Sequence, residues 1–226
     1  MTAFFETPFF GVALTILAYW AMVKLQQKLK NQLANPLLLS IVVVSAVLII
    51  FKIPYSAYDM GGTIINMFLG PATACLAVSI YSKRQLLKKN WLPVVVGCTV
   101  GSLTSMTSIY VMCKLFKLDD TLTMALLPKS VTTPIAVSIS GAHGGIVPVT
   151  VVAVIITGVL GSIFAPLLIK IFNVKEPFAQ GLAIGASSHA VGTSKAIELG
   201  EAQGAMSGLA IGVCGVITVL FSLFIS

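Results

Sequence analysis

Apolar runs long enough to cross a lipid bilayer follow one another through most of this sequence. A membrane-spanning helix needs about 20 mostly apolar residues, and the stretches closest to that length are 4–23, 36–51, 63–81, 91–113, 146–171 and 206–226. Only 9% of the residues are charged, whereas a soluble domain carries about 25%. The sequence therefore predicts an all-α polytopic membrane protein with about 6 spanning helices, formed as a single domain over residues 1–226.

The net charge of +7 comes largely from short basic clusters beside apolar runs. One cluster contains Lys24, Lys28 and Lys30, and the other lies within 83–89. Such clusters mark the cytoplasmic ends of membrane helices, so the charge does not indicate nucleic-acid binding. With both clusters inside, the N-terminus and the C-terminus are expected outside, in the periplasm of a bacterial inner membrane.

The first polar interruption lies within 121–145 and reads ALLPKSVTTPIAVSIS at its centre. Pro128 disfavours helix before it, and Pro134 suits the first turn of a new half-helix with Thr133 as its N-cap. That half-helix would direct its positive end at the break. The sequence predicts a carboxylate site there, formed by Lys129, Ser130, Thr132 and Thr133. A Pro-kinked helix whose lysine reaches an interface is the alternative.

The second interruption lies near 178–200 and contains a run of small and polar residues. We expect substrate-binding donors at Ser188, His189, Thr193 and Ser194. Lys195 and Glu198 can pair across one helical turn and tune the local charge, and His189 or Glu198 could carry a coupling proton. The alternative is a polar helix packed against its neighbours, in which His189 is only hydrogen-bonded.

The topology after Cys113 stays open at this point. If both interrupted segments are re-entrant, Lys170 and Lys175 lie inside, and if both segments cross, these lysines lie outside. The Lys/Arg bias of cytoplasmic loops favours re-entry. A stripe of glycines and serines along 97–108 is interpreted as a surface for close helix packing.

No catalytic motif of a hydrolase, metalloprotease or nucleotide-binding enzyme occurs in the sequence. The chain is therefore not expected to be an enzyme. The four cysteines form no CxxC pair and are interpreted as small core residues. Two histidines are too few for a metal cluster, so neither a metal nor a cofactor is expected.

Four stretches that span nearly the whole chain resemble the CidB/LrgB family, in the family's order. They are NPLLLS at 35–40, FLGPATACLAVSIY at 68–81, LPKSVTTPIAVSIS at 127–140 and GASSHAVGTSKAIELGEAQGAMSGLA at 185–210. The chain is similar to the stand-alone inner-membrane members from Gram-negative bacteria. The family also looks similar to dimeric elevator-type transporters with crossed broken helices.

The resemblance implies partners and a function that composition does not. It implies a small LrgA/CidA-type membrane partner, and a homodimer or higher oligomer. The family's plastid relative exchanges glycolate and glycerate, and some bacterial members are linked to pyruvate uptake or to control of murein hydrolases. We therefore expect a transporter or facilitator of small monocarboxylates in the lipid bilayer. The alternative is a holin/antiholin-like protein that regulates autolysis.

Overall fold

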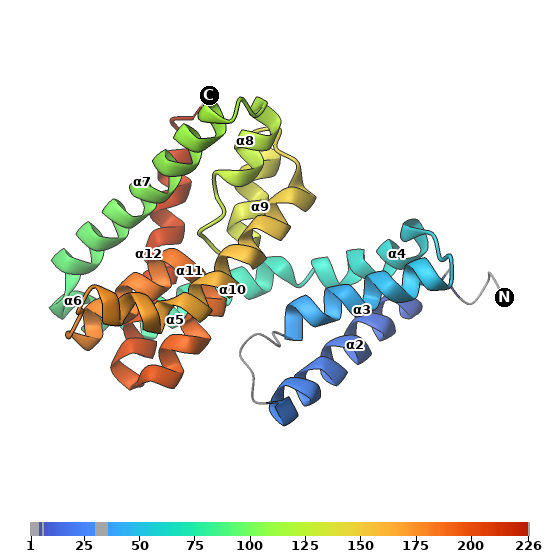
Figure 1. Cartoon of the computed structure of the whole chain (residues 1–226), viewed down its shortest axis with the longest axis horizontal. Helices are drawn as coiled ribbons and strands as arrows, with labels where there is room; N and C mark the ends of the chain where they lie inside the picture. Colours follow the sequence, from blue (N-terminus) through green and yellow to red (C-terminus); the bar gives the residue numbers. More distant parts are fainter. Residues whose placement is uncertain (1–4, 6, 30–35, 226) are drawn as a thin grey trace. The chain divides into compact units, whose positions relative to one another are not determined.

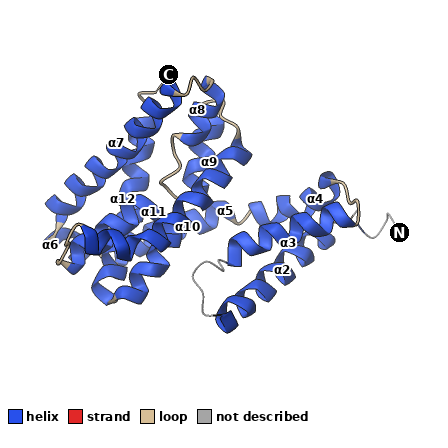
Figure 2. Cartoon of the chain, in the orientation of Figure 1, coloured by secondary structure: helices blue, strands red, loops and turns tan. Residues whose placement is uncertain are grey.

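Helices form all the regular structure of the described residues, which are 5, 7–29 and 36–225 (Figure 2). This computed structural model divides into two compact units, residues 1–72 and 73–226. Among the described residues, four helices are long and apolar enough to cross a membrane, namely α2 (Pro8–Leu29), α7 (Trp91–Leu115), α10 (Val147–Ile171) and α12 (Glu201–Ser222). The predicted all-helical class with several membrane helices is confirmed, while the number of spans stays a prediction.

The first unit packs α2 against α3 (Pro36–Ile50) and α4 (Tyr55–Asn66). α2 and α4 meet at two glycines, since a Cβ on Gly11 would lie 3.0 Å from the Cα of Gly61. Beside this contact the hydroxyls of Thr15 and Tyr58 share a hydrogen bond of 2.9 Å. Small residues thus let the two backbones approach closely, as in other membrane helix pairs.

Two boundaries predicted in this region differ from the structure. The sequence KIPYSAYDMGG at 52–62 separates two apolar runs and predicts a turn, but α4 begins at Tyr55. The stretch 63–81 is predicted as one segment broken near Gly70, yet the break lies at Met67–Phe68, before α5 (Leu69–Ser82). The last turn of α4 and most of α5 are apolar, so composition hides the boundary. Asn35 stands directly before the predicted segment 36–51, where its side chain is expected to cap the helix, but it lies outside the described residues.

The second unit is built on α7 and α12, which run parallel (Figure 1). Residue numbers rise in the same direction along both helices. The Cys98 thiol lies 4.0 Å from the Ala210 carbonyl oxygen, and further along both helices the Thr218 hydroxyl lies 3.5 Å from Ser102 Oγ. Their shared core contains Val94, Cys98, Met206, Leu209, Ala210 and Cys214. The short helix α6 (Arg84–Lys89) precedes α7. Together, α7 and α12 form the frame against which the interrupted segments lie.

The first interrupted segment folds back on itself as α8 (Asp120–Leu126) and α9 (Thr133–Ala142), which lie side by side in Figure 1. Asp120 at the start of α8 and His143 after the end of α9 line the same pocket. A Cβ on Gly145 would lie 2.8 Å from the backbone nitrogen of Ala125. Residues 120–142, called the first hairpin below, therefore begin and end at the same end of the unit.

The second interrupted segment is α11 (Pro177–Leu199), which is broken at His189. Ile184 and Ala196 belong to one core cluster with Ala165. In an unbroken helix these two residues would be about 18 Å apart along the axis, so the halves on either side of His189 lie against each other. α11, called the second hairpin below, has His189 at its tip. α10 joins the two hairpins.

Candidate functional site at the tips of two hairpins

The tips of the two hairpins meet at one residue of α10, Val154. Val131 of the first tip packs with Val154 and Ala136 in a buried cluster. At the second tip, the Nε2 nitrogen of His189 lies 2.9 Å from the backbone carbonyl oxygen of Val154, to which it donates. Two breaks that are some 60 residues apart in sequence thus lie at one level of the unit.

Glycines in the middle of α10 make room for the second tip. A Cβ on Gly158 would lie 2.6 Å from Cε1 of His189, and a Cβ on Gly161 would overlap the side chain of Ser188. Side chains at these positions would push the tip away from α10, because protein interiors leave no spare volume of this size. The sequence shows both glycines, but only the fold reveals what they face.

The first tip contains a polar group that has no partner. Thr132, and not Thr133, is the N-cap of α9, which begins at Thr133 with Pro134 in its first turn. Either threonine is a residue type that suits an N-cap, but an N-cap residue has a non-helical backbone. Thr132 has that extended backbone, whereas Thr133 is already helical. Thr132 is only 5% exposed, and its hydroxyl makes no hydrogen bond, including to the amides of α9. A buried hydroxyl left in this way costs free energy unless something binds it.

Lys129 and Ser130 lie beside each other at the first tip. The ammonium of Lys129 donates to Ser130 Oγ over 3.0 Å, and this oxygen shares a hydrogen bond of 2.7 Å with Ser105 Oγ on α7. Lys129 is partly buried, and it has no carboxylate partner within the described part of the chain. The break therefore carries a positive charge without a counter-ion at the positive end of a helix.

The polar groups of the second tip are bonded to the protein itself. The Ser188 hydroxyl shares a 3.0 Å hydrogen bond with Ser187. Thr193 donates to the His189 carbonyl oxygen over 2.9 Å and shares a 2.7 Å hydrogen bond with Ser207 of α12. His189 is 4% exposed and bonded to Val154. This arrangement agrees with the hydrogen-bonded histidine that the sequence left as an alternative.

The remaining predicted residues lie on the returning half of the second hairpin. Ser194 is exposed and bonds only weakly to the Ala190 carbonyl, at 3.4 Å. The predicted pairing of Lys195 with Glu198 is confirmed, with 2.9 Å between Nζ and Oε2. Glu198 faces outward, with 59% of its side chain exposed.

Hydroxyl groups of the framework helices surround the first tip, and the sequence did not single them out as site residues. A small cavity of about 10 Å³ lies between the first tip, α7, α11 and α12. Ser102, Ser105, Ser130 and Thr218 contribute their side chains to its lining. The two α7 serines belong to the stripe interpreted as a packing surface. Because these two serines are three residues apart, their hydroxyls lie on one face of the helix, and this spacing could have indicated a polar lining.

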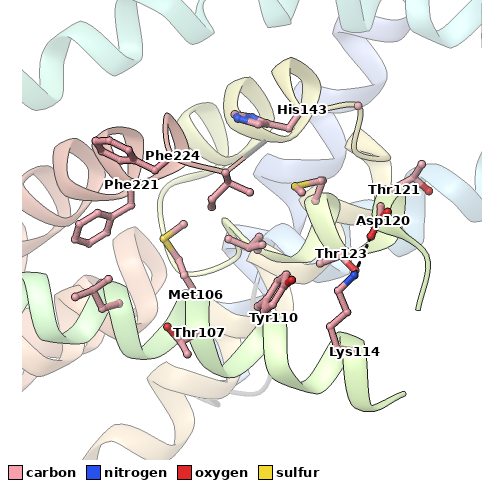
Figure 3. Close-up of a pocket in the computed structure, with 15 residues that line it drawn as sticks. Met106, Thr107, Tyr110, Lys114, Asp120, Thr121, Thr123, His143, Phe221 and Phe224 are labelled. Carbon is pink, nitrogen blue, oxygen red and sulfur yellow. Dashed lines mark hydrogen bonds and ion pairs between the residues drawn. The ribbon is translucent and has the colours of Figure 1, made fainter. Parts of the chain in front are cut away.

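A larger pocket of about 850 Å³ opens at the end of the unit where the first hairpin begins and ends. Figure 3 shows Met106 and Tyr110 projecting into it from α7, with His143 on the opposite side and Phe221 and Phe224 of the C-terminal region along another wall. Lys114 and Asp120 form an ion pair of 3.1 Å at its exposed rim. Within the described residues no cluster of three or more His, Cys, Asp or Glu could bind a metal.

Comparison with known proteins places the chain in a family. The LrgB-like family model matches residues 15–226. The antiholin-like protein LrgB of Bacillus subtilis is 38% identical over 215 residues, which cover 95% of this chain and 93% of that protein. The uncharacterized protein YxaC of the same organism is 38% identical over 210 residues, covering 93% and 91%. No solved structure matches the chain. By its sequence over nearly its whole length, the chain belongs to the LrgB-like family.

Proposed function

We propose that this protein carries a small monocarboxylate across the bacterial inner membrane and binds it at the tip of the first hairpin. The observation that carries the proposal is the buried, unpartnered hydroxyl of Thr132 at the N-terminus of α9, next to an uncompensated Lys129. Helix N-termini favour anions because free amides and the helix dipole point at the ligand. A carboxylate accepts hydrogen bonds from all these donors. The proposed function involves no chemical reaction.

The arrangement of the hairpins supports a transport pathway rather than a static pore. The first hairpin enters from the end that carries Lys114, and the second enters from the end where α10 finishes. We propose that both are re-entrant in the membrane and that their meeting tips expose the site to alternate sides, as broken helices do in secondary transporters. An elevator-like motion, a homodimer and about six spans in total belong to this proposal, with both termini outside.

Uptake into proteoliposomes tests the proposal. The protein is reconstituted with and without a small LrgA/CidA-type partner, and labelled glycolate, glycerate, lactate and pyruvate are offered with or without a proton gradient. Lys129→Gln should raise the KM for the transported acid at least tenfold, because it removes a charge that is partly shielded from water. Lys175→Gln removes an exposed lysine in the loop before α11 and should leave the KM unchanged.

Saturable uptake that Lys129→Gln leaves intact, in a variant with a normal melting temperature, would contradict the proposed site. If no acid is taken up under any condition, the transport function itself fails. The two results are distinct, because the parent protein is measured in the same preparation.

The second candidate is antiholin-like control of murein hydrolases and autolysis. It rests on the name of the relative that is 38% identical over 95% of the chain, and the comparisons favour it more directly than they favour carboxylate transport. It predicts that deletion of the gene changes autolysis and extracellular murein hydrolase activity, and that Lys129→Gln complements the deletion as well as the parent. Failure of Lys129→Gln to restore normal lysis would instead tie lysis control to the anion site.

A further inference from the structure

The small cavity at the first tip and the large pocket share a wall. Met106 of α7 and Leu127, the residue after α8, line both spaces. Both side chains are buried, with exposed fractions of 8% and 4%. On one side lies the wide pocket with Lys114 and Asp120 at its rim, and on the other lie the hydroxyls of Ser102 and Ser130. An apolar partition thus separates two spaces that each contain polar groups.

We propose that Met106 and Leu127 form a gate between the large pocket and the small cavity beside the first tip, which Ser130 lines next to the Lys129 that donates to it. This inference rests on the proposed transport function and adds to it the route and the barrier. A cavity of about 10 Å³ holds about one water molecule, so even a two-carbon acid enters only after the wall moves. A charged solute does not cross an apolar constriction while that constriction is dry.

The two residues differ in the way that they can move. Leu127 is the C-cap of α8 and stands directly before Pro128, where the chain leaves the helix for the break between α8 and α9. Met106 lies within α7, whose backbone is held by the core that it shares with α12. The Met side chain is unbranched and adapts to different shapes, so it can swing aside while its helix stays in place. Displacement of the hairpin tip then widens the opening from the other side.

Cysteine reactivity in lipid nanodiscs tests the gate without relying on uptake. Cys75 is exposed and is replaced by Ser, whereas the cysteines at 98, 113 and 214 are buried and are retained. Ser102→Cys places a reporter in the small cavity, and Thr107→Cys places a matched reporter in the large pocket on the same helix. A membrane-impermeant, negatively charged methanethiosulfonate is the probe, and the rate of modification is followed by mass spectrometry.

We expect the reporter at 107 to react rapidly in every background and the reporter at 102 to react slowly while Met106 is present. Met106→Ala should accelerate the reaction at 102 at least tenfold. Leu127→Ala, which removes the side chain that the first hairpin contributes to the same wall, should also accelerate it. Met106→Leu keeps an apolar side chain of similar volume and should leave the rate unchanged. A normal melting temperature and a single elution peak show that each variant is folded.

Two results would overturn the gate. One is a reporter at 102 that reacts as fast as the reporter at 107 while Met106 is in place. The other is a reporter at 102 that stays slow in both alanine variants although the parent transports its substrate. Missing uptake combined with the expected acceleration would count against the transport function instead, since the partition would then be real and no substrate would use it.

Discussion

The two hairpins fold back in a similar way but differ in what their tips leave unsatisfied. The first tip is a six-residue break, 127–132, between two separate helices. It contains Pro128, the uncompensated Lys129 and the unpartnered hydroxyl of Thr132. The second tip departs from helical geometry at His189 alone, with φ 42° and ψ −140°. There, His189 and Thr193 bond to neighbouring protein groups.

Under the proposed function, the second tip is a structural support and the first tip is a binding site. The positive φ of His189 is a strained backbone conformation that costs about 1–3 kcal/mol, and the bond to Val154 on α10 helps to offset this cost. The second tip is therefore positioned by the fold. The first tip instead leaves the hydroxyl of Thr132 without a partner, which the proposed anion site requires.

The largest expected effect is a loss of stability when the glycine of α10 that contacts the second tip is replaced. Gly158→Ala should lower the free energy of unfolding by about 1–3 kcal/mol, a typical cost of overpacking, because the new Cβ meets His189 at 2.6 Å and Val191 at 2.8 Å. Alanine is intrinsically the better helix former and would by itself raise the free energy of unfolding. A decrease therefore shows that steric overlap with the second tip outweighs helix propensity. Thermal unfolding in detergent measures the change.

Gly141→Ala in α9 is the matched control, since its Cβ would meet only Val147, at an ordinary 3.8 Å. We expect it to be neutral or slightly stabilising. If Gly158→Ala is as well tolerated as this control, the second tip is not held against α10, and the contrast between the hairpins is lost.

The changes in stability caused by two threonine substitutions, one at each tip, should differ by about 1–2 kcal/mol. Thr132→Val removes a buried hydroxyl that has no partner, so stability should stay the same or rise by about 1 kcal/mol, while carboxylate affinity falls. Thr193→Val breaks the hydrogen bond to Ser207 and should cost about 1 kcal/mol. Unfolding curves with and without the transported acid measure both effects. Equal stability losses would mean that the hydroxyl of Thr132 is also bonded within the protein.

The smallest effect concerns the way in which each hairpin begins. Asp119 caps α8, and its carboxylate accepts hydrogen bonds from the Leu122 amide at 2.7 Å and the Thr121 hydroxyl at 2.9 Å. These bonds hold the pKa of Asp119 below its ordinary value. The cap therefore stabilises α8 fully at pH values above the ordinary pKa of an aspartate. This stabilisation is lost as the pH falls through the lower pKa that Asp119 has in the folded state. Glu176, before α11, makes no such side-chain bond.

Hydrogen exchange measures this difference. Asp119→Ala should speed exchange at the Leu122 amide, and Glu176→Ala should leave the start of α11 unchanged. Equal responses at the two sites would show that the cap of Asp119 has no role in holding the first hairpin.

The sequence predicted the features that depend on local chemistry. Long apolar runs indicated membrane helices because each must bury its backbone polar groups within itself. Pro128 and Pro134 indicated the first break, since proline restricts the backbone wherever it stands. The spacing of Lys195 and Glu198 predicted their ion pair, which the structure confirms. Boundaries within continuous apolar sequence, such as the break at Met67–Phe68, had no such local signal.

The tertiary structure alone decided which polar groups remain available. Ser188, His189 and Thr193 have the same donors in any fold, and packing against α10 and α12 is what occupies His189 and Thr193. The same packing leaves Thr132 without a partner and brings Met106 and Leu127 together between two cavities. By itself, the sequence determined the family, the all-helical membrane class and the first break. Whether a donor is used or left free depends on neighbours far along the chain, and only the fold supplies them.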